Sequence, residues 1–281
     1  MNRSARAADG SVLDRVVATK RAEIAALAPR RTALRRLAEA AAEARPFGAA
    51  LAVRGQVAVI AEYKRRSPSA GTIGGGEPGS VAAVYETGGA SALSVVTDAE
   101  YFGGSLADLE VARAAVGLPV LRKDFILDDV QVWEARAAGA DAILLIVRIL
   151  EDGRLRGLLE LSRELGMAAV VEAHDAAEVD RAVEVGATLV GVNNRDLSTF
   201  RTDLAVSESL VERIPADRLA VAESGIRDRS DVERLGRAGF HAVLVGETLM
   251  RSPGEDSVRS MVGLPRRERA LAPDIWRASS C

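Results

Sequence analysis

The sequence predicts a (β/α)8 TIM barrel, an α/β fold, with extra helices at the N-terminus. Helix-like segments end in Gly, and a branched apolar run starts at once or within a residue or two, as Gly139 precedes ADAILLIV. Gly closes the last turn of a helix in the left-handed conformation. The runs are apolar throughout, which is typical of strands buried on both faces of a parallel sheet. With 281 residues, the chain is long enough for one such barrel of about 250 residues.

Eight strand-plus-helix units follow one another along the chain. The expected strands are residues 57–63, 91–97, 118–125, 140–147, 167–173, 187–194, 219–224 and 240–246. The expected helices are 81–87, 106–115, 129–138, 152–165, 176–185, 204–213, 230–238 and a short one after Pro253. A doubly wound open sheet is the alternative. No Gly-rich dinucleotide loop follows the first strand, which favours the closed barrel.

The two ends of the chain do not fit this repeat. Residues 1–50 are expected to form a helical extension, with Ser11 as a helix cap, Asp14 three residues later and a second amphipathic segment at about 32–44. Residues 51–262 form the predicted barrel. Residues 263–281 fit no unit, and we expect a tail that is either disordered or packed on the outside.

Composition excludes several classes of function. The chain has 37 basic and 40 acidic residues, a net charge of −3, which predicts no nucleic-acid or membrane partner. The single cysteine, Cys281, allows no intrachain disulfide, and no His, Asp and Glu set has the spacing of metal ligands. The opening MNRSARAADG has no apolar stretch, so a cytoplasmic protein is expected. No pattern demands an oligomer.

Charged and polar residues stand at the carboxyl ends of five expected strands, where TIM-barrel active sites lie. They are Glu62 with Lys64, Lys123, Glu172, Asn193 with Arg195, and Glu223. Period-2 alternation puts Glu62 and Lys64 on one face of their strand. A single such residue is more often a rim salt bridge. Together they indicate acid–base chemistry on an anionic substrate.

Glycines and a serine near the last two strands indicate a phosphate site. Ser224 is followed by Gly225, and Gly246 closes the last strand, which matches the usual phosphate site of these barrels. The Gly triplet 74–76 after the first strand is better suited to a mobile lid than to a phosphate cradle. His174 lies near the mouth but is weak evidence for substrate contact, and His241 is expected to be structural.

Together, the strand-end segments resemble the indole-3-glycerol-phosphate synthase family over about residues 11–262. The matching segments are EYKRRSPS, SVVTDAEYFGGS, LRKDFI, DAILLIVRIL, VEAHD, GVNNRDL, AESGI and LVGETLM. The resemblance implies closure of the indole ring of 1-(2-carboxyphenylamino)-1-deoxyribulose 5-phosphate, with loss of CO2 and water, in tryptophan biosynthesis. It implies no cofactor and a phosphorylated small molecule as the substrate.

The resemblance also implies roles for individual residues. Lys123 would be the general acid, Glu172 a general base, and Lys64 a substrate contact that donates a proton in the dehydration, helped by Glu62. Asn193 would hydrogen-bond reacting groups, and Arg195 would pair with Glu223. Ser224, Gly225, Gly246 and Glu247 would surround the phosphate, with Glu247 using only its backbone N–H. Ser67 lies in the first loop, and Phe102 would form a wall for the anthranilate ring. We expect burial and Lys64 to lower the pKa of Lys123.

Three alternatives compete with this interpretation. A phosphoribosylanthranilate isomerase is expected to carry a Cys base at the first strand, where this chain has Glu62 and Lys64. A barrel that binds a phosphorylated ligand without catalysis is the alternative from a different class, although every catalytic position has the expected residue type. A duplicate enzyme serving secondary metabolism would keep the same residues.

Overall fold

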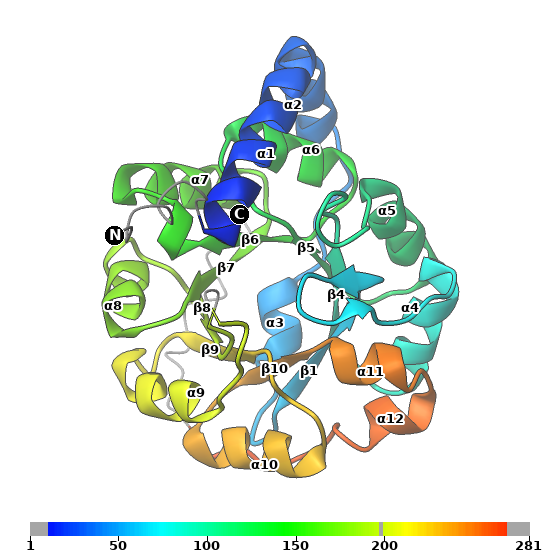
Figure 1. The fold of residues 1–281 in the computed structure, drawn as a ribbon, viewed down its shortest axis with the longest axis vertical. Coiled ribbons are helices and arrows are strands. Elements are labelled where there is room, and N and C mark those ends of the chain that lie inside the picture. The colour runs from blue at the N-terminus through cyan, green and yellow to red at the C-terminus, as the bar shows by residue number, and fades with distance from the viewer. Residues whose placement is uncertain (1–10, 197–198, 269–281) are drawn as a thin grey trace, which may run out of the picture.

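A computed structural model of the chain describes residues 11–196 and 199–268. Within these ranges, eight parallel strands close into a barrel in the order β1-β10-β9-β8-β7-β6-β5-β4, with helices around the outside (Figure 1). The predicted TIM barrel is therefore confirmed. Predictions that concern Leu197, Cys281 and the far end of the tail lie outside the described residues.

The elements follow the predicted order. The barrel strands are β1 (Ala58–Tyr63), β4 (Ala92–Val96), β5 (Val120–Lys123), β6 (Ala142–Ile146), β7 (Ala168–Ala173), β8 (Leu189–Asn193), β9 (Leu219–Glu223) and β10 (Ala242–Val245), and a hairpin above β1 contains β2 (Arg66–Ser67) and β3 (Gly71–Thr72). The helices of the barrel are α4 (Pro78–Thr87), α5 (Leu106–Ala115), α6 (Asp129–Ala137), α7 (Asp152–Glu164), α8 (Ala176–Glu184), α9 (Ala205–Leu210), α10 (Arg229–Ala238), α11 (Glu247–Arg251) and α12 (Glu255–Arg259), with short 3-10 turns η2 (Val147–Ile149) and η3 (Val211–Arg213).

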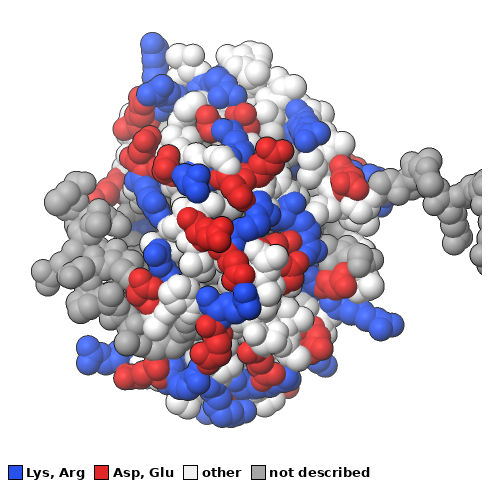
Figure 2. Space-filling view, turned by 90° about the vertical axis from the view of Figure 1, so that its left-hand side faces the viewer, with Lys and Arg blue, Asp and Glu red and all other residues white. Residues whose placement is uncertain are grey.

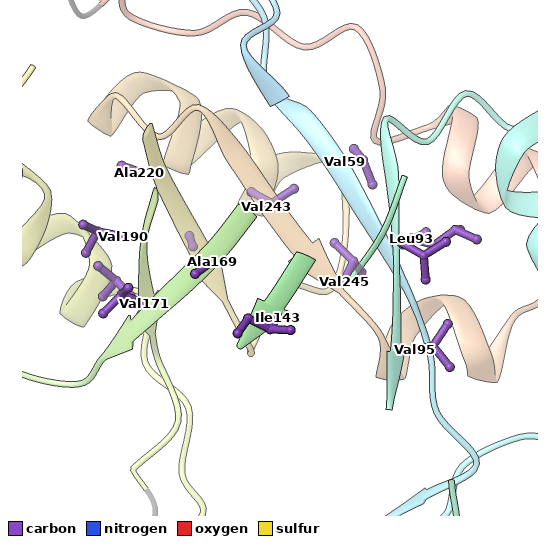
Figure 3. Packing of buried hydrophobic residues seen from close by; sticks show 14 of the residues in the cluster. Val59, Leu93, Val95, Ile143, Ala169, Val171, Val190, Ala220, Val243 and Val245 are labelled. Carbon is purple, nitrogen blue, oxygen red and sulfur yellow. The ribbon is translucent and has the colours of Figure 1, made fainter. Parts of the chain in front are cut away.

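Alternation along each strand sorts its side chains into two apolar layers. In β1, Val59 and Ala61 point outward into the layer beneath the helices, while Ala58 and Ile60 point into the barrel. Figure 3 shows the outward layer, to which most barrel strands contribute small and branched residues. Residues two apart share a face. The inward series of β1 therefore continues from Ile60 to Glu62 at the mouth.

Helices before the barrel pack on its side and at its bottom. They are α1 (Val12–Leu27), η1 (Ala28–Arg30), α2 (Arg31–Glu39) and α3 (Phe47–Leu51). Ser11 caps α1 in a reciprocal hydrogen-bonded pair with Asp14, as predicted. Phe47 and Leu51 of α3 pack against the inward residues at the amino ends of the strands and close the bottom. The helices α1 and α2 project beyond the ring over α6 (Figure 1).

Residues after α12 pack on the outside of the barrel. The backbone N–H of Val57 donates to Leu264 O at 2.9 Å, and Arg267 N donates to Gly236 O at 2.9 Å. Leu264 is buried. The stretch 263–268 therefore runs along the start of β1 and the end of α10. His241 lies at the amino end of β10, where its Nδ1 accepts from Ala220 N at 3.1 Å.

The charges on the surface are mixed. Acidic and basic side chains are interspersed over the face that carries α7, α8 and α9 (Figure 2). No helix in the described part of the chain has the length and apolar character that a membrane span requires.

Candidate active site

The mouth of the barrel holds a pocket enclosing about 840 Å³ of space that opens to solvent. Its lining includes Glu62, Lys64, Ser67, Phe102, Lys123, Glu172, Asn193, Arg195, Glu223 and Ser224. A second hollow adjoins it and adds Gly225, Gly246 and Glu247. The structure thus brings every residue singled out from the sequence to one end of the barrel. Glu62, Glu172, Glu223 and the two lysines arrive there because each continues the inward series of its strand.

Lys123 is the centre of this cluster. Its Nζ lies 2.9 Å from Glu172 Oε2 and 3.1 Å from Glu223 Oε2, so one ammonium joins the ends of β5, β7 and β9. The Lys123 side chain is 18% exposed, through the pocket, whereas those two carboxylates are buried. Lys123 therefore lies between these two carboxylates and the open space of the pocket.

The expectation that the pKa of Lys123 is lowered is wrong. Burial does lower the pKa, but the charges of Glu172, Glu223 and Glu62 act in the opposite direction and raise the pKa of Lys123 well above its usual range. The expectation considered burial but not these three carboxylates, which together outweigh it. Lys123 is therefore an ammonium at neutral pH and has a proton to give.

The two carboxylates beside Lys123 have opposite pKa shifts. Burial raises the pKa of Glu172, but Lys123 and His174 more than offset burial and lower that pKa to about 2. Burial, Glu172 and Glu62 raise the pKa of Glu223 to about 7 against the attraction of Lys123. Two carboxylates that share one ammonium do not both ionise easily. Glu172 is therefore the ionised member of the pair at neutral pH.

A second ion pair lies on β1. Lys64 Nζ donates to Glu62 Oε1 at 2.7 Å, and Ser94 Oγ donates to Glu62 Oε2 at 3.1 Å. Burial raises the pKa of Glu62, but the charges of Lys64 and Lys123 lower it by more than burial raises it. The net shift of the pKa is downward. Glu62 is 3% exposed and fixes the direction of Lys64, whose side chain is 15% exposed.

Two glycines make room for the buried carboxylates. A Cβ on Gly246 would lie 2.4 Å from Glu62 Oε1, and a Cβ on Gly191 would lie 2.2 Å from Glu223 Oε1. Both distances are far below van der Waals contact. Gly246 was expected beside a phosphate. The space that Glu62 occupies is a second reason why this position needs a Gly. Gly191 was not singled out from the sequence, because a Gly inside a strand does not reveal which side chain of the neighbouring strand lies over it.

The expected pairing of Arg195 with Glu223 is wrong. Arg195 Nη1 donates to Ser69 Oγ and to Phe200 O, each at 3.1 Å, and its Nη2 lies 4.0 Å from Glu247 Oε2. Glu223 points into the barrel toward Lys123, while Arg195 has already left β8 and turns toward the loop after β1. Asn193 accepts from the Arg195 backbone N–H at 3.0 Å and so orients this turn.

The second hollow, where the sequence predicts a phosphate, lies at the ends of β9 and β10. Ser224 and Gly225 both adopt positive φ angles, 68° and 79°. A serine in this conformation is uncommon and is often found at functional sites. Asn194 holds the turn, because its Nδ2 donates to Ser224 O at 3.1 Å. The Glu247 side chain turns away to Arg251 Nη2 at 2.9 Å.

Several residues of the pocket were missed by sequence reasoning. Phe125 lies opposite Phe102, with ring centroids 6.2 Å apart, so the apolar wall has two aromatic rings. Arg227 and Arg251 line the second hollow. Phe125, the Phe of LRKDFI, lies two residues after Lys123 and could have been found by position. Arg227 lies in the charged loop before α10 and Arg251 at the end of α11, and nothing in the sequence distinguishes them from other surface arginines.

The loop after β1 covers one edge of the pocket. Ser67 and Ser69 belong to the β2–β3 hairpin region, and Ser67 Oγ accepts from Ala70 N at 3.2 Å. Within the Gly triplet, Gly74 packs so closely on Met250 that a Cβ would lie 2.5 Å from the carbonyl oxygen of that residue. Gly74 is therefore needed for close packing. Whether the triplet also lets a lid move stays a prediction.

The described residues contain no group of three or more His, Cys, Asp and Glu side chains placed to hold a metal ion.

Comparison with known proteins identifies the family. The family model described as indole-3-glycerol phosphate synthase matches residues 13–261. The chain belongs to the indole-3-glycerol phosphate synthase family. The strand-end motifs had predicted this, and that prediction is confirmed.

Curated relatives agree with the family model. A protein of Albidiferax ferrireducens named indole-3-glycerol phosphate synthase is 48% identical over 248 residues, which is 86% of this chain and 94% of that protein. One from Leifsonia xyli with the same name is 56% identical over 218 residues, 76% of this chain and 84% of that protein. Among solved structures, the N-acetylmannosamine-6-phosphate 2-epimerase of Clostridium perfringens covers 72% of this chain and 91% of its own, with a TM-score of 0.57 and 15% identity, and supports the fold alone.

Proposed function

We propose that this chain is an indole-3-glycerol-phosphate synthase acting in tryptophan biosynthesis. It would convert 1-(2-carboxyphenylamino)-1-deoxyribulose 5-phosphate to indole-3-glycerol phosphate, CO2 and water. The observation that carries this proposal is the contact of Lys123 with both Glu172 and Glu223 in a pocket that also holds Lys64. We also propose that the enzyme acts on this dissolved small molecule in the cytoplasm.

Ring closure would begin at Lys123. The ring carbon that bears the carboxylate attacks the ribulose carbonyl carbon, and Lys123 Nζ gives a proton to the carbonyl oxygen, which becomes a hydroxyl group. The bond to the carboxylate then breaks, CO2 leaves, and the electron pair restores the aromatic ring. An ammonium already aimed into a buried pocket stabilises the developing oxyanion better than water does.

Dehydration would use a second acid and a base. Glu172 takes a proton from the carbon next to the nitrogen, and Lys64 gives a proton to the hydroxyl, which leaves as water. The hydrogen bond of 2.7 Å from Lys64 to Glu62 supports this role, since it holds the ammonium in place. Asn193 would hydrogen-bond the reacting groups at the end of β8.

Binding would divide between the two ends of the pocket. Phe102 and Phe125 would enclose the anthranilate ring. Ser224, Gly225, Gly246 and the backbone N–H of Glu247 would receive the phosphate, where backbone N–H groups of turns suit an anion. Arg195 and Ser67 would close the side formed by the loop after β1.

Turnover of the carboxyphenylamino-deoxyribulose phosphate tests this proposal. The purified chain is mixed with that substrate and the appearance of indole fluorescence is followed. The proposal predicts steady formation of the fluorescent product without added metal or cofactor. Saturable binding of substrate with no product would instead indicate a barrel that binds the ligand without catalysis.

A further inference from the structure

Helix α1 docks on the barrel through one narrow buried face. Of its 16 residues, Val16 and Lys20 are the buried ones. Their spacing puts them on the same side of the helix, one turn apart. Lys20 is only 1% exposed. A lysine usually keeps its ammonium group in water, so its burial here requires partners inside the protein.

Two carboxylates at the barrel mouth are these partners. Lys20 Nζ lies 2.8 Å from Asp98 Oδ2, after the end of β4, and 3.0 Å from Asp124 Oδ1, after the end of β5. Both aspartates are buried and belong to the lining of the pocket. Burial lowers the pKa of Lys20, but the two aspartates outweigh burial and raise that pKa above its usual range. Lys20 is therefore an ammonium that joins two parts of the pocket wall.

Each aspartate also holds one aromatic residue of the pocket. Asp98 Oδ1 accepts a hydrogen bond from the backbone N–H of Phe102 at 3.1 Å. Asp124 Oδ1 accepts one from the backbone N–H of Phe125 at 2.8 Å. The two rings lie with their centroids 6.2 Å apart. One ammonium on α1 thus connects the two turns that carry both rings of the apolar wall.

A second contact from α1 reaches the same turn after β4. Thr19 Oγ1 lies 2.9 Å from Tyr101 Oη. The backbone N–H of Tyr101 donates to Asp98 Oδ1 at 2.7 Å, the same oxygen that holds Phe102. Two neighbouring residues of α1 therefore hold the turn that leads from Asp98 to Phe102.

Lys20 also balances the charge of this wall. Arg122 Nη2 lies 3.2 Å from Asp124 Oδ2, but it is shared with Glu134 Oε2 at 3.0 Å. Without Lys20, the two buried aspartates would have only this shared cation. The substrate of the proposed function carries a carboxylate on its aromatic ring. Uncompensated negative charge in the wall would oppose the binding of that ring.

We propose that Lys20 is a positioning residue for the aromatic ring of the substrate. Its ammonium fixes Asp98 and Asp124 relative to each other, and these fix the turns from which the two phenylalanines project. Lys20 acts through the aspartates and is not a catalytic residue. The helix before the barrel thereby becomes part of the ring-binding wall. This inference rests on the proposed function, which places the ring beside Phe102 and Phe125.

Four variants separate this role from simple docking of α1. Lys20→Met removes the ammonium and keeps a long side chain, whereas Lys20→Arg keeps the charge and should restore part of the loss. Val16→Ala is the matched control, because Val16 is the other buried residue of α1 and has no polar side-chain atom. Thr19→Val removes only the hydroxyl contact with Tyr101, and it keeps the inference testable if Lys20→Met does not fold.

The two ends of the pocket are probed separately. The fluorescence of 2-aminobenzoate reports binding at the ring end, and inorganic phosphate is used as a competitive inhibitor of turnover for the other end. In Lys20→Met, the Kd for 2-aminobenzoate and the KM for substrate should rise about tenfold or more, since misplacement by about 1 Å can cost that much. The kcat should stay within about threefold, because the wall binds substrate and transition state alike.

The inhibition constant of phosphate should stay within about twofold in Lys20→Met, because distant sites without shared partners act independently. Thr19→Val should weaken binding of 2-aminobenzoate in the same direction but by less. Val16→Ala should leave the binding of both probes unchanged, even where it lowers stability.

Other results would overturn the inference. Equal weakening of both probes in Lys20→Met and Val16→Ala would make Lys20 only a dock for α1. An unchanged Kd for 2-aminobenzoate in folded Lys20→Met, or in Thr19→Val if Lys20→Met does not fold, would show that the wall keeps its shape without these contacts. A parent chain that binds 2-aminobenzoate but forms no indole product would overturn the proposed function alone, because ring binding is read without turnover.

Discussion

Replacing Gly246 with Ala tests how tightly the buried carboxylate of Glu62 is held. The new Cβ would lie 2.4 Å from Glu62 Oε1, 3.1 Å from its carboxyl carbon and 3.2 Å from its Cβ, so rotation of the carboxyl alone cannot relieve the contact. Gly246 has a φ of −118°, which Ala also adopts, so no backbone strain is added. The effect therefore reports the side-chain contact alone.

The magnitude follows from overpacking and the loss of an ion pair. Forcing an extra methyl group into a packed interior costs about 1–3 kcal/mol. Glu62 must also move away from Lys64 and Ser94, which donate to it at 2.7 and 3.1 Å. We expect the free energy of unfolding to fall by about 3 kcal/mol, near the top of that range. Because Lys64 loses its support, kcat/KM should fall by about tenfold or more.

Urea denaturation and steady-state kinetics measure these two effects. Gly157→Ala is the control, because a Cβ there meets nothing within 4 Å inside helix α7 and should raise stability by up to about 1 kcal/mol. Glu62→Asp in the Gly246→Ala background shortens the crowded side chain, so the two changes should be less than additive. Full additivity, or a stable and active Gly246→Ala, would refute the close contact.

Two further predictions concern buried charges. Lys20 Nζ of α1 lies 2.8 Å from Asp98 Oδ2 and 3.0 Å from Asp124 Oδ1, and all three side chains are at most 2% exposed. In Lys20→Met two buried carboxylates lose their cation. The free energy of unfolding, measured by urea denaturation, should therefore fall by about 3–5 kcal/mol. Arg35→Ala, which breaks an exposed pair with Glu39, should change stability little, and an equal loss in both variants would contradict this reasoning. The raised pKa of Glu223, about 7 against 4.5 for a free carboxyl, means that the folded state binds its proton more tightly than the unfolded state. Its contribution to stability is therefore complete below about pH 4.5 and is lost as pH rises to about 7, on the order of 3 kcal/mol. Glu223→Gln should remove this part of the pH dependence of the unfolding free energy, and an unchanged slope between those pH values would show that Glu223 does not titrate there.

The barrel and the mouth residues were predictable from the sequence for a physical reason. Apolar strand segments repeat eight times, six of them soon after a Gly at the end of a helix-like segment, and period-2 alternation fixes which residues face inward. Glu62 could therefore be assigned to the mouth from its strand alone. The same rule brought Lys123, Glu172 and Glu223 to one place.

The partner of each charged group was not predictable in the same way. Lys123 reaches across from β5 to β7 and β9, and those distances depend on how the barrel closes. The lowered pKa expected for Lys123 and the pairing expected between Arg195 and Glu223 were errors of this kind. Lys20 shows the same limit, because a lysine in an N-terminal amphipathic helix usually faces solvent. Its burial depends on where α1 docks.

The most direct test of the account is substrate turnover by Lys123→Met beside the parent chain. Indole fluorescence reports product, and substrate binding is measured separately by calorimetry. We expect the parent to form product. We expect Lys123→Met to bind substrate but to lose at least about a hundredfold in kcat, because the general acid is missing. Equal turnover by the two proteins would contradict the assignment of Lys123 as the proton donor.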